Sequence, residues 1–275
     1  MTHLNRRKAL ALMGGTVAAA GLSAPAYAQN KTIKVGALRF TSHSASFIAQ
    51  ERKYFADAGL NVEFEFFQAA TPMAVAIASG DVDYAVTAVS GGLINLAEKG
   101  AIKVIGGALS EESGIDGQKY LASNAAFQAG VTSCAALDGK RYAVTQSGSS
   151  FHYMGSKMAQ AEGIDLSFVP LQKVGAIIGA MKSGQVDGWS IVPHIAKPLA
   201  GSGALHIIGN VADYLPDYQV TTVFTSAKNA ADERGQTESF LNAFSKGADD
   251  YAAAMIDGTA DQDAMVDLIH KYVYA

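Results

Sequence analysis

The sequence predicts an α/β protein with two lobes, each a parallel-rich sheet flanked by helices. Strand-like and helix-like segments alternate along the chain, an order typical of parallel sheets with right-handed crossovers. In addition, residues 62–86 align without a gap with residues 166–190, and seven positions are identical in the two copies. Because a period of about 100 residues is longer than the units of stacked-repeat proteins, we expect two lobes built on one plan.

The composition is that of an ordinary globular protein. The chain has 275 residues, of which 49% are hydrophobic and 17% charged, and this length suits two lobes. Its net charge of −4 comes without a basic stripe, so we expect no nucleic-acid partner. Cys134 is the only cysteine, which excludes an intrachain disulfide and indicates a buried, small apolar residue.

The first 28 residues carry the three features of an export signal. The sequence Arg-Arg-Lys at 6–8 precedes the uncharged apolar run 9–22, and Ala26-Tyr27-Ala28 gives a small-residue cleavage pattern. The paired arginines indicate the twin-arginine route. We therefore expect cleavage after about Ala28 and a periplasmic location. The run is shorter than the roughly 20 residues that span a bilayer, and no longer one follows, so we expect no membrane-spanning helix.

Each copy is predicted to run strand, helix, strand, helix, strand. In the first copy we expect strands over 32–38, 62–67, 82–86 and 103–107 and helices over 44–58, 71–79 and 90–99. In the second copy we expect strands over 141–145, 166–171, 186–191 and 205–209 and helices over 149–161, 173–183 and 194–199. Gly80 and Gly184 follow equivalent helices and support these helix ends.

Two further strands are predicted outside the copies, over 119–122 and 220–225. The first leads into the second lobe and the other leads back, so the chain crosses twice between the lobes. We expect lobe one over residues 31–118 and 219–275, and lobe two over residues 119–218. Two crossings form a hinge rather than a loose linker.

Three loops between a strand and the next helix are rich in Ser, Thr and Gly: 36–46, 87–92 and 145–153. In open parallel sheets, ligands bind beyond the carboxyl ends of the strands. A helix N-terminus there offers unpaired N–H groups and a partial positive charge, which favour an anion or a carboxylate. Serine and glycine are also ordinary helix caps. Three such loops, two at matching places in the copies, favour a shared ligand site over capping alone.

Three single residues have two interpretations each. Arg39 ends the first strand, where it would either pair with an acidic ligand or have no ligand role, being solvated or held in a structural ion pair. His152 would donate to a ligand or be a buried histidine satisfied by a neighbour. Trp189, the only tryptophan, would belong to the core or cover the apolar part of a ligand. Pro193-His194 lies at the next strand-to-helix junction.

Catalytic and metal-binding patterns are missing from the sequence. There is no G-x-S-x-G, H-E-x-x-H or Walker motif, and the six histidines lack metal-ligand spacing. Asp83 and Asp187 hold the same place in the two copies, which indicates a structural position rather than a catalytic carboxylate pair. We therefore expect no cofactor, no metal and no enzyme activity.

Several segments resemble the nitrate/sulfonate/taurine-type periplasmic solute-binding proteins of ABC importers. They are KVGALRF at 34–40, FIAQERKYFADAGLNVEFEFF at 47–67, IASGDVDYAVTAVSGGL at 77–93, LDGKRYAVTQSGSSFHY at 137–153 and AMKSGQVDGWSIVPHI at 180–195. In this order they extend over about residues 31–199, which is most of the chain after the expected cleavage point. The resemblance implies a two-lobed, type II-like periplasmic-binding-protein fold, closure on a ligand in the cleft, and delivery to a membrane permease.

The resemblance also implies ligand-binding roles for certain positions. These are Arg39, Ser42, His43, Ser90, Gly91, Ser149, Ser150, Phe151, His152, Trp189, Pro193, His194 and Tyr218. Family members commonly have Trp or Asp near 191–193, where this chain reads Ile-Val-Pro. This departure leaves the identity of the solute open.

We therefore predict an exported, monomeric, non-enzymatic protein that captures a small anion by hinge closure. Sulfonates, nitrate and aromatic carboxylates are the expected class, and the expected partners are this solute and an ABC permease subunit. The alternative is a thiamine-pyrimidine-synthase-like protein, or a binder of pyrimidine or thiamine precursors, on the same fold; the export signal argues against the cytosolic enzyme. A hydrolase using Ser150 and His152 would lack an evident orienting carboxylate.

Overall fold

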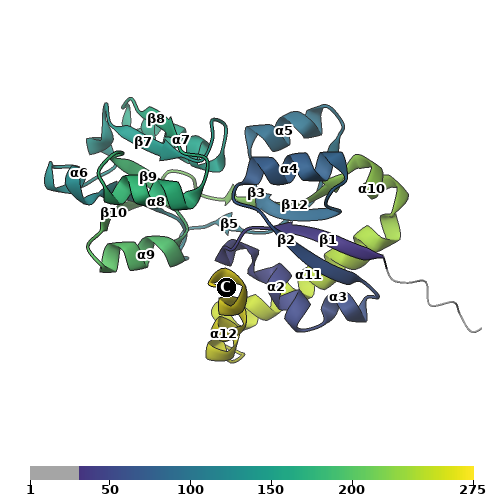
Figure 1. Ribbon diagram of the computed structural model, residues 1–275. Helices are drawn as coiled ribbons and strands as arrows, with labels where there is room; N and C mark the ends of the chain where they lie inside the picture. Colours follow the sequence, from purple (N-terminus) through teal and green to yellow (C-terminus); the bar gives the residue numbers. More distant parts are fainter. Residues whose placement is uncertain (1–30) are drawn as a thin grey trace, which may run out of the picture. The chain divides into compact units, whose positions relative to one another are not determined.

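A computed structural model describes residues 31–275 and contains two separate five-stranded sheets (Figure 1). The strands of the first sheet, in spatial order, are β2 (Asn61–Phe66), β1 (Thr32–Ala37), β3 (Tyr84–Ala88), β12 (Thr221–Ser226) and β4 (Ile102–Gly107). Those of the second are β8 (Ser167–Pro170), β7 (Arg141–Val144), β9 (Gly188–Ile191), β6 (Lys119–Ser123) and β10 (Leu205–Asn210). Residues Thr32–Ala275 form one unit, and within it no strand is shared between the sheets.

The repeat seen in the sequence corresponds to a repeated strand–helix–strand unit. β2, helix α4 (Ala70–Ser79) and β3 make the first copy, and β8, α8 (Val174–Lys182) and β9 make the second. Each helix is followed by a glycine in the left-handed region, Gly80 with φ 83° and Gly184 with φ 69°. Asp83 and Asp187 are also equivalent, because each carboxylate accepts a backbone N–H of the neighbouring strand, from Lys34 and Arg141 respectively. The structural interpretation of this aspartate pair is therefore confirmed.

Both sheets are parallel-rich, as predicted, and each holds one inner strand of the opposite direction. β12 runs antiparallel between β3 and β4, and β6 runs antiparallel between β9 and β10. Each of these strands follows a connection that comes from the other sheet. A helical crossover within one sheet joins parallel strands, whereas a connection from the other sheet does not fix the direction of the strand. Ser123 and Ser226, which end these strands, cap the short helices α6 (Asn124–Gln128) and α10 (Ala227–Asp232).

The inner strand β3 of the first sheet, with the sequence YAVTA, is buried on both faces, as a nearly continuous apolar strand is expected to be. In β3, Tyr84 and Val86 face one core cluster, whereas Ala85 faces another. Figure 1 shows α4 and α5 (Gly91–Glu98) on one side of this sheet. The helices of the other side are α2 (Ser44–Glu51), α3 (Tyr54–Asp57) and α11 (Arg234–Met255), and α12 (Gln262–Val273) packs on α2.

The helix predicted over 44–58 is interrupted. Lys53 adopts a left-handed conformation with φ 63° and separates α2 from α3. Such a conformation costs a non-glycine residue roughly 1–2 kcal/mol. The change of direction turns Phe55 into the core, where its ring stacks on Phe240 with centroids 5.1 Å apart. Burial of that ring offsets the backbone cost.

The second sheet has a single core cluster. Its helices are α6, α7 (Ser150–Glu162), α8 and α9 (Pro193–Gly201), and 3-10 turns cover Thr41–His43, Ala135–Leu137 and Val211–Asp213 of the chain. Cys134 is 2% exposed in this core, and burial raises the pKa of its thiol to about 11. The prediction of a buried, small apolar cysteine is therefore confirmed, because a thiol with that pKa stays protonated.

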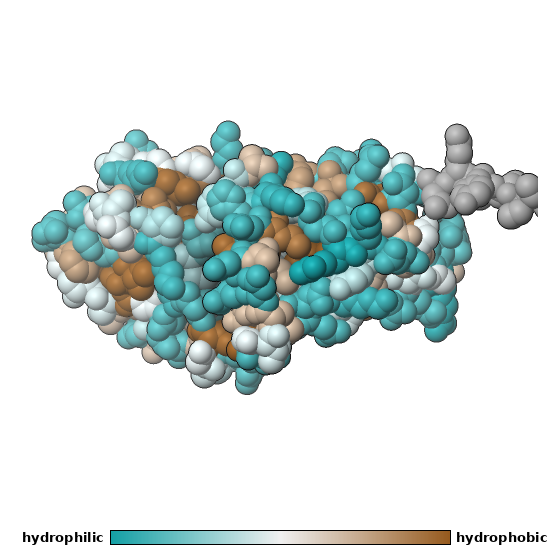
Figure 2. Space-filling view, turned by 90° about the horizontal axis from the view of Figure 1, so that it is seen from below, coloured by the Kyte–Doolittle hydropathy of each residue, from teal (hydrophilic) through white to brown (hydrophobic). Residues whose placement is uncertain are grey.

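The two crossings lie side by side and form a short two-stranded sheet of their own. It pairs β5 (Ser110–Glu111) with β11 (Tyr218–Gln219), which the sequence did not predict. The predicted export signal, over residues 1–28, lies outside the described residues. Within residues 31–275, no helix combines the length and the apolar character that crossing a membrane requires. On the face drawn in Figure 2, hydrophilic residues cover most of the surface and hydrophobic ones gather in small patches.

Candidate functional site

A cavity lies where the loops of both sheets meet. Its volume is about 40 Å³, room for about three water molecules. Its apolar lining consists of Leu38, Phe40, Ala69, Ala70, Ala88, Phe151, Val174, Val192 and Val220, and its polar lining of Ser42, His43, Gln68, Gln118, Thr145, Ser149, Ser150 and Thr221. In this conformation the cavity accepts only a very small solute, and a larger one requires it to widen.

Most of the lining residues come from the carboxyl ends of strands in both sheets, and Gln118, Val220 and Thr221 lie in or beside the crossings. The segments after β1, β2 and β3 contribute from the first sheet, and those after β7, β8 and β9 from the second. This is the place where open parallel sheets bind ligands. Among the predicted site residues, the structure brings five to this cavity: Ser42, His43, Ser149, Ser150 and Phe151.

The start of α7 supplies a cluster of hydrogen-bond donors to the cavity wall. Ser149 is the N-cap, and its hydroxyl accepts the backbone N–H of His152 at 3.3 Å. The N–H groups of Ser150 and Phe151 belong to the first turn and have no partner inside the helix. The Ser150 side chain is 6% exposed and lines the cavity. These two amides, one hydroxyl and the positive end of the helix dipole favour a negatively charged or carbonyl oxygen.

His43 is the only titratable side chain among the lining residues, and it is 1% exposed. Burial lowers the pKa of its imidazole to about 4; the nearby backbone of Val86 acts in the opposite direction, and the nearby His194 lowers the pKa further. Nδ1 lies 3.1 Å from the Ser42 hydroxyl. Because the ring is neutral at physiological pH and no Lys or Arg of the described chain, residues 31–275, lines the cavity, this part of the protein places no full positive charge in the cavity wall.

Ser90 and Gly91 do not line the cavity. The Ser90 hydroxyl accepts the N–H of Leu93 as the cap of α5, and the N–H of Gly91 donates to the carbonyl of Gly148 at 2.8 Å. Gly148 belongs to the loop before α7, so two loops predicted to face a common ligand are hydrogen-bonded to each other. Their donors are occupied in this conformation.

The side chain of Arg39 also contacts other protein groups instead of lining the cavity. Its Nη1 donates to the carbonyl of Tyr272 at 2.7 Å, and its guanidinium lies 3.9 Å from the centre of the Phe66 ring. Arg39 therefore ties the loop after β1 to the end of α12. Of its two predicted interpretations, the geometry favours the structural one, although the partners are a carbonyl and an aromatic ring instead of a carboxylate.

Trp189 and His152 lie in the second half, away from the cavity. Trp189 is fully buried in the core, where its ring centre is 6.0 Å from that of Phe151. His152 accepts the N–H of Gly148 through Nδ1 at 2.9 Å, and its ring packs edge-on against Phe168 at 4.2 Å. The imidazole is thus engaged by its own loop, and no contact pairs it with Ser150.

His194, at the start of α9, connects the second half with two segments of the first. Its Nδ1 is hydrogen-bonded to the Thr41 hydroxyl at 2.9 Å, and its carbonyl accepts the hydroxyl of Tyr274 at 3.3 Å. Burial lowers the pKa of this imidazole to about 4. Pro193 occupies the first turn of α9, where proline is favoured. Tyr218 lies in β11 with its ring 5.3 Å from that of Tyr153; neither Pro193 nor Tyr218 lines the cavity.

The sequence reasoning missed several polar lining residues, among them Gln68, Gln118, Thr145 and Thr221. Gln68 is one of the identical positions of the repeat, at the carboxyl end of β2, and that coincidence was an available signal. Gln118 and Thr221 lie beside the crossings, where no motif marks them. Within residues 31–275, no group of three or more His, Cys, Asp or Glu side chains is arranged to hold a metal.

Comparison with solved structures gives the fold. The chain is similar to the nitrate-binding protein NrtA from Synechocystis PCC 6803, with TM-score 0.74 and 14% identity over 89% of this chain and 67% of that one. It is similar to the alkanesulfonate-binding protein SsuA from Xanthomonas axonopodis pv. citri, with TM-score 0.71 and 18% identity over 87% and 78% of the two chains.

A ligand-binding component of an ABC-type import system from Staphylococcus aureus, solved with zinc bound, matches with TM-score 0.71 and 13% identity, over 88% of this chain and 79% of that one. At these identities the likeness shows the periplasmic-binding-protein fold alone. No curated protein is similar enough in sequence to count as a relative. The model of one family, described as NMT1/THI5 like, matches residues 40–254. Because this match covers more than half of the chain, the protein belongs to the NMT1/THI5-like family.

Proposed function

We propose that the protein is the solute-binding component of an ABC-type importer and captures a small anion in the cavity between its two sheets. One observation carries the proposal: the carboxyl ends of strands from both sheets line one cavity together with the first residues of α7, whose N–H groups have no partner inside the helix. The solved proteins of the same fold include binders of nitrate and of alkanesulfonates. Arg-Arg-Lys at 6–8 and Ala26-Tyr27-Ala28 support export to the periplasm, where a permease would receive the solute.

The charge of the cavity restricts the solute. No Lys or Arg lines the cavity, so the helix dipole and neutral donors must hold the acid group. A dipole equivalent to about half a charge compensates a single negative charge better than two. Nitrate, sulfonates and aromatic carboxylates carry one charge each and stay within the proposed class, with Phe40 and Phe151 available to cover an apolar part.

We further propose that residues 31–118 with 219–275, and residues 119–218, move as two lobes about the paired crossings. Solute contacts from both halves would then favour the closed population. The hydrogen bonds from Gly91 to Gly148 and from Thr41 to His194 join the two halves and would break on opening. The proposed unit of function is the monomer, because one chain supplies both walls of the cavity.

A thermal-shift screen of the exported form tests this function, with nitrate, MOPS, benzoate and cytosine as probes. A probe at 100 times its Kd should add about 2.7 kcal/mol of stability. Binding should also change the fluorescence of Trp189, because its ring touches Phe151 at the cavity wall. The proposal fails if none of the acids stabilises the protein; chemical conversion of a bound probe would support an enzyme instead.

Substitutions of the two serines at the start of α7 should affect different properties: the affinity for the solute at Ser150 and the stability of the fold at Ser149. Replacing Ser150 with alanine should weaken the binding of an acid probe by about 1 kcal/mol, because a solute oxygen loses one donor. Replacing Ser149 with alanine should lower the free energy of unfolding by about 1 kcal/mol through loss of the cap. Calorimetry and chemical denaturation measure the two effects. Equal affinity of the Ser150→Ala variant and the parent would place this hydroxyl outside the site.

A single substitution can remove the hydrogen bond between the two loops, in which the N–H of Gly91 donates to the carbonyl of Gly148. Gly91 is the first residue of α5, a position that favours proline, and the preceding Ser90 has the extended conformation that a residue before proline adopts. Gly91→Pro should therefore keep the helix and lose the bond to Gly148, and the proline Cδ would press on that carbonyl oxygen. Both effects favour open, solute-free molecules, by at least about 1 kcal/mol. Small-angle scattering should report a larger radius of gyration.

Gly91→Ala is the matched control for this variant. A Cβ there would lie 3.6 Å from the Gly148 carbonyl oxygen, an ordinary contact, and the N–H remains. Identical scattering from the proline and alanine variants would show that this bond does not hold the halves together.

A further inference from the structure

Gln118 is a buried polar residue without a structural partner for its side-chain amide. It lies between β5 and β6, in the crossing that enters the second sheet, and it is 2% exposed. It lines the cavity, and its Nε2 has no hydrogen-bond partner among the described residues. Leaving a buried donor unpaired costs about 1–3 kcal/mol, so such groups call for an explanation. A solute in the cavity would supply the missing acceptor.

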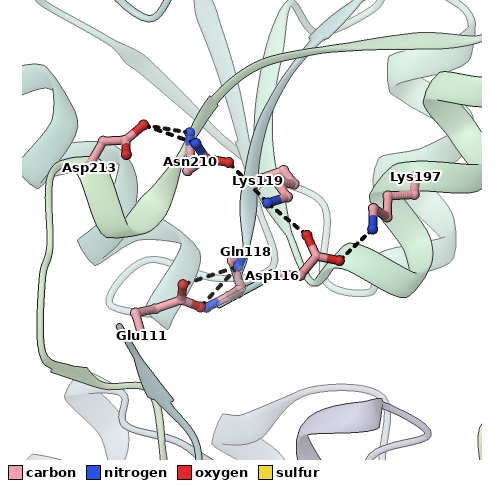
Figure 3. Close-up of polar contacts among 7 residues, drawn as sticks. All are labelled: Glu111, Asp116, Gln118, Lys119, Lys197, Asn210 and Asp213. Carbon is pink, nitrogen blue, oxygen red and sulfur yellow. Dashed lines mark hydrogen bonds and ion pairs between the residues drawn. The ribbon is translucent and has the colours of Figure 1, made fainter. Parts of the chain in front are cut away.

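The backbone of Gln118 is held firmly by a buried carboxylate. Glu111 is fully buried, and both of its carboxylate oxygens accept the N–H of Gln118, at 3.0 and 3.1 Å. Figure 3 shows this carboxylate against the Gln118 backbone. At Gly117 a Cβ would lie 2.0 Å from Glu111 Oε2, so only glycine leaves room for the carboxylate. These two residues fix the position from which the Gln118 side chain starts.

Three charged side chains around this turn form ion pairs, Asp116 with both Lys119 and Lys197. Lys119 Nζ lies 3.0 Å from Asp116 Oδ1 and donates to Asn210 Oδ1 at 3.0 Å, and Lys197 pairs with the other oxygen of Asp116 (Figure 3). The lysine next to Gln118 is therefore engaged by these partners. The donor that this crossing can offer to the cavity is the neutral amide of Gln118.

The second crossing provides a contrast. Gln219 lies in β11, and its Nε2 donates to the carbonyls of Leu109 at 3.0 Å and Thr221 at 2.7 Å. Its amide is used within the crossing itself, and it does not line the cavity. Of these two glutamines, one is satisfied by the fold and the other is not.

We infer that Gln118 binds the solute directly, by donating its side-chain amide to an acceptor oxygen, and that Glu111 and Gly117 are positioning residues for it. This inference rests on the proposed function and adds a contact from the crossing to the donors of α7. The solute then bridges two walls of the cavity: α7 on one side and the connection between the sheets on the other. A solute with at least two acceptor oxygens, such as nitrate, a carboxylate or a sulfonate, satisfies both.

The test uses the exported form of the full chain with nitrate, MOPS and benzoate as probes in calorimetry. Gln118→Leu removes the donor without leaving an unpaired amide, so the solute-free protein should be at least as stable as the parent. Its affinity for a probe that the parent binds should fall about tenfold. Gln118→Glu should reduce it further, because a second negative charge faces the anion. Affinity within twofold of the parent in Gln118→Leu would overturn the inference.

Two controls complete the experiment. Gln219→Leu should lower the thermal stability but leave the affinity unchanged, since its amide serves the crossing. Glu111→Leu should lower the affinity. Glu111→Gln keeps one acceptor for the Gln118 N–H and should therefore retain most of the parent's affinity. Equal losses of affinity in the two variants would contradict a positioning role for Glu111. If no probe binds the parent, the proposed function fails and the inference fails with it, a result distinct from normal binding by the Gln118 variants.

Discussion

Replacing Gly247 with alanine is expected to destabilise the protein by about 3 kcal/mol, the upper part of the range for overpacking. Gly247 lies in α11 where this helix crosses α2. A Cβ at this position would lie 2.1 Å from the carbonyl oxygen of Ala45 and 3.0 Å from the amide nitrogen of Ala49. Both are backbone atoms, so no side chain can rotate to make room and the two helices must separate.

The separation would reach the site because α2 follows the loop after β1. That loop carries Ser42 and His43, two of the residues that line the cavity. Urea denaturation at constant pH measures the loss of stability. Gly235→Ala is the matched control in the same helix: among residues 31–275, no atom outside the adjoining turns of α11 lies within 4 Å of the added Cβ, so alanine should stabilise α11 by up to about 1 kcal/mol. Equal effects of the two substitutions would contradict the close helix contact as the cause.

The sequence predicted the fold well because the fold rests on local and repeated signals. Alternating strands and helices, the offset repeat and glycines such as Gly80 and Gly184 each depend on a few neighbouring residues. The same reasoning located the cavity, since the loops after β1 and β7 follow from strand order alone. It did not predict the antiparallel direction of β6 and β12, because those strands pair with segments about 70–140 residues away in the chain.

The sequence could not show which of the predicted hydrogen-bond donors are already bonded to other parts of the protein. Arg39 is engaged by Tyr272, 233 residues later, and Gly91 by Gly148 in the other half. A Ser- and Gly-rich loop looks the same whether its amides face a solute or another loop. Gln118 shows the converse: its local sequence carries no signal, and only the burial of an unpaired amide beside the cavity distinguishes it from Gln219.

Acid is expected to destabilise the protein by about 3 kcal/mol through His43 alone, because the pKa of its buried imidazole is lowered from 6.5 to about 4. The sign follows from proton binding. In the unfolded chain the imidazole takes up a proton below about pH 6.5, whereas in the folded protein it stays neutral until about pH 4. The unfolded state therefore binds more protons within this window, and stability falls as the pH is lowered through it. His194, whose pKa is also lowered to about 4 by burial, adds to the loss in the same direction.

Chemical denaturation from about pH 8 to pH 4 measures this loss, with His43→Gln as the variant that cannot titrate. The carboxyl groups of Asp116 and Asp187 have pKa values lowered from 3.8, so their contribution is lost below this window and cancels in the comparison. The variant bears a constant cost from the replaced ring, which is read at pH 8, where His43 is neutral in both states. Between pH 6.5 and 4 its free energy of unfolding should fall less steeply than that of the parent. Parallel curves would show that His43 is accessible to protons in the folded protein, and the neutral wall of the cavity would then become cationic in acid.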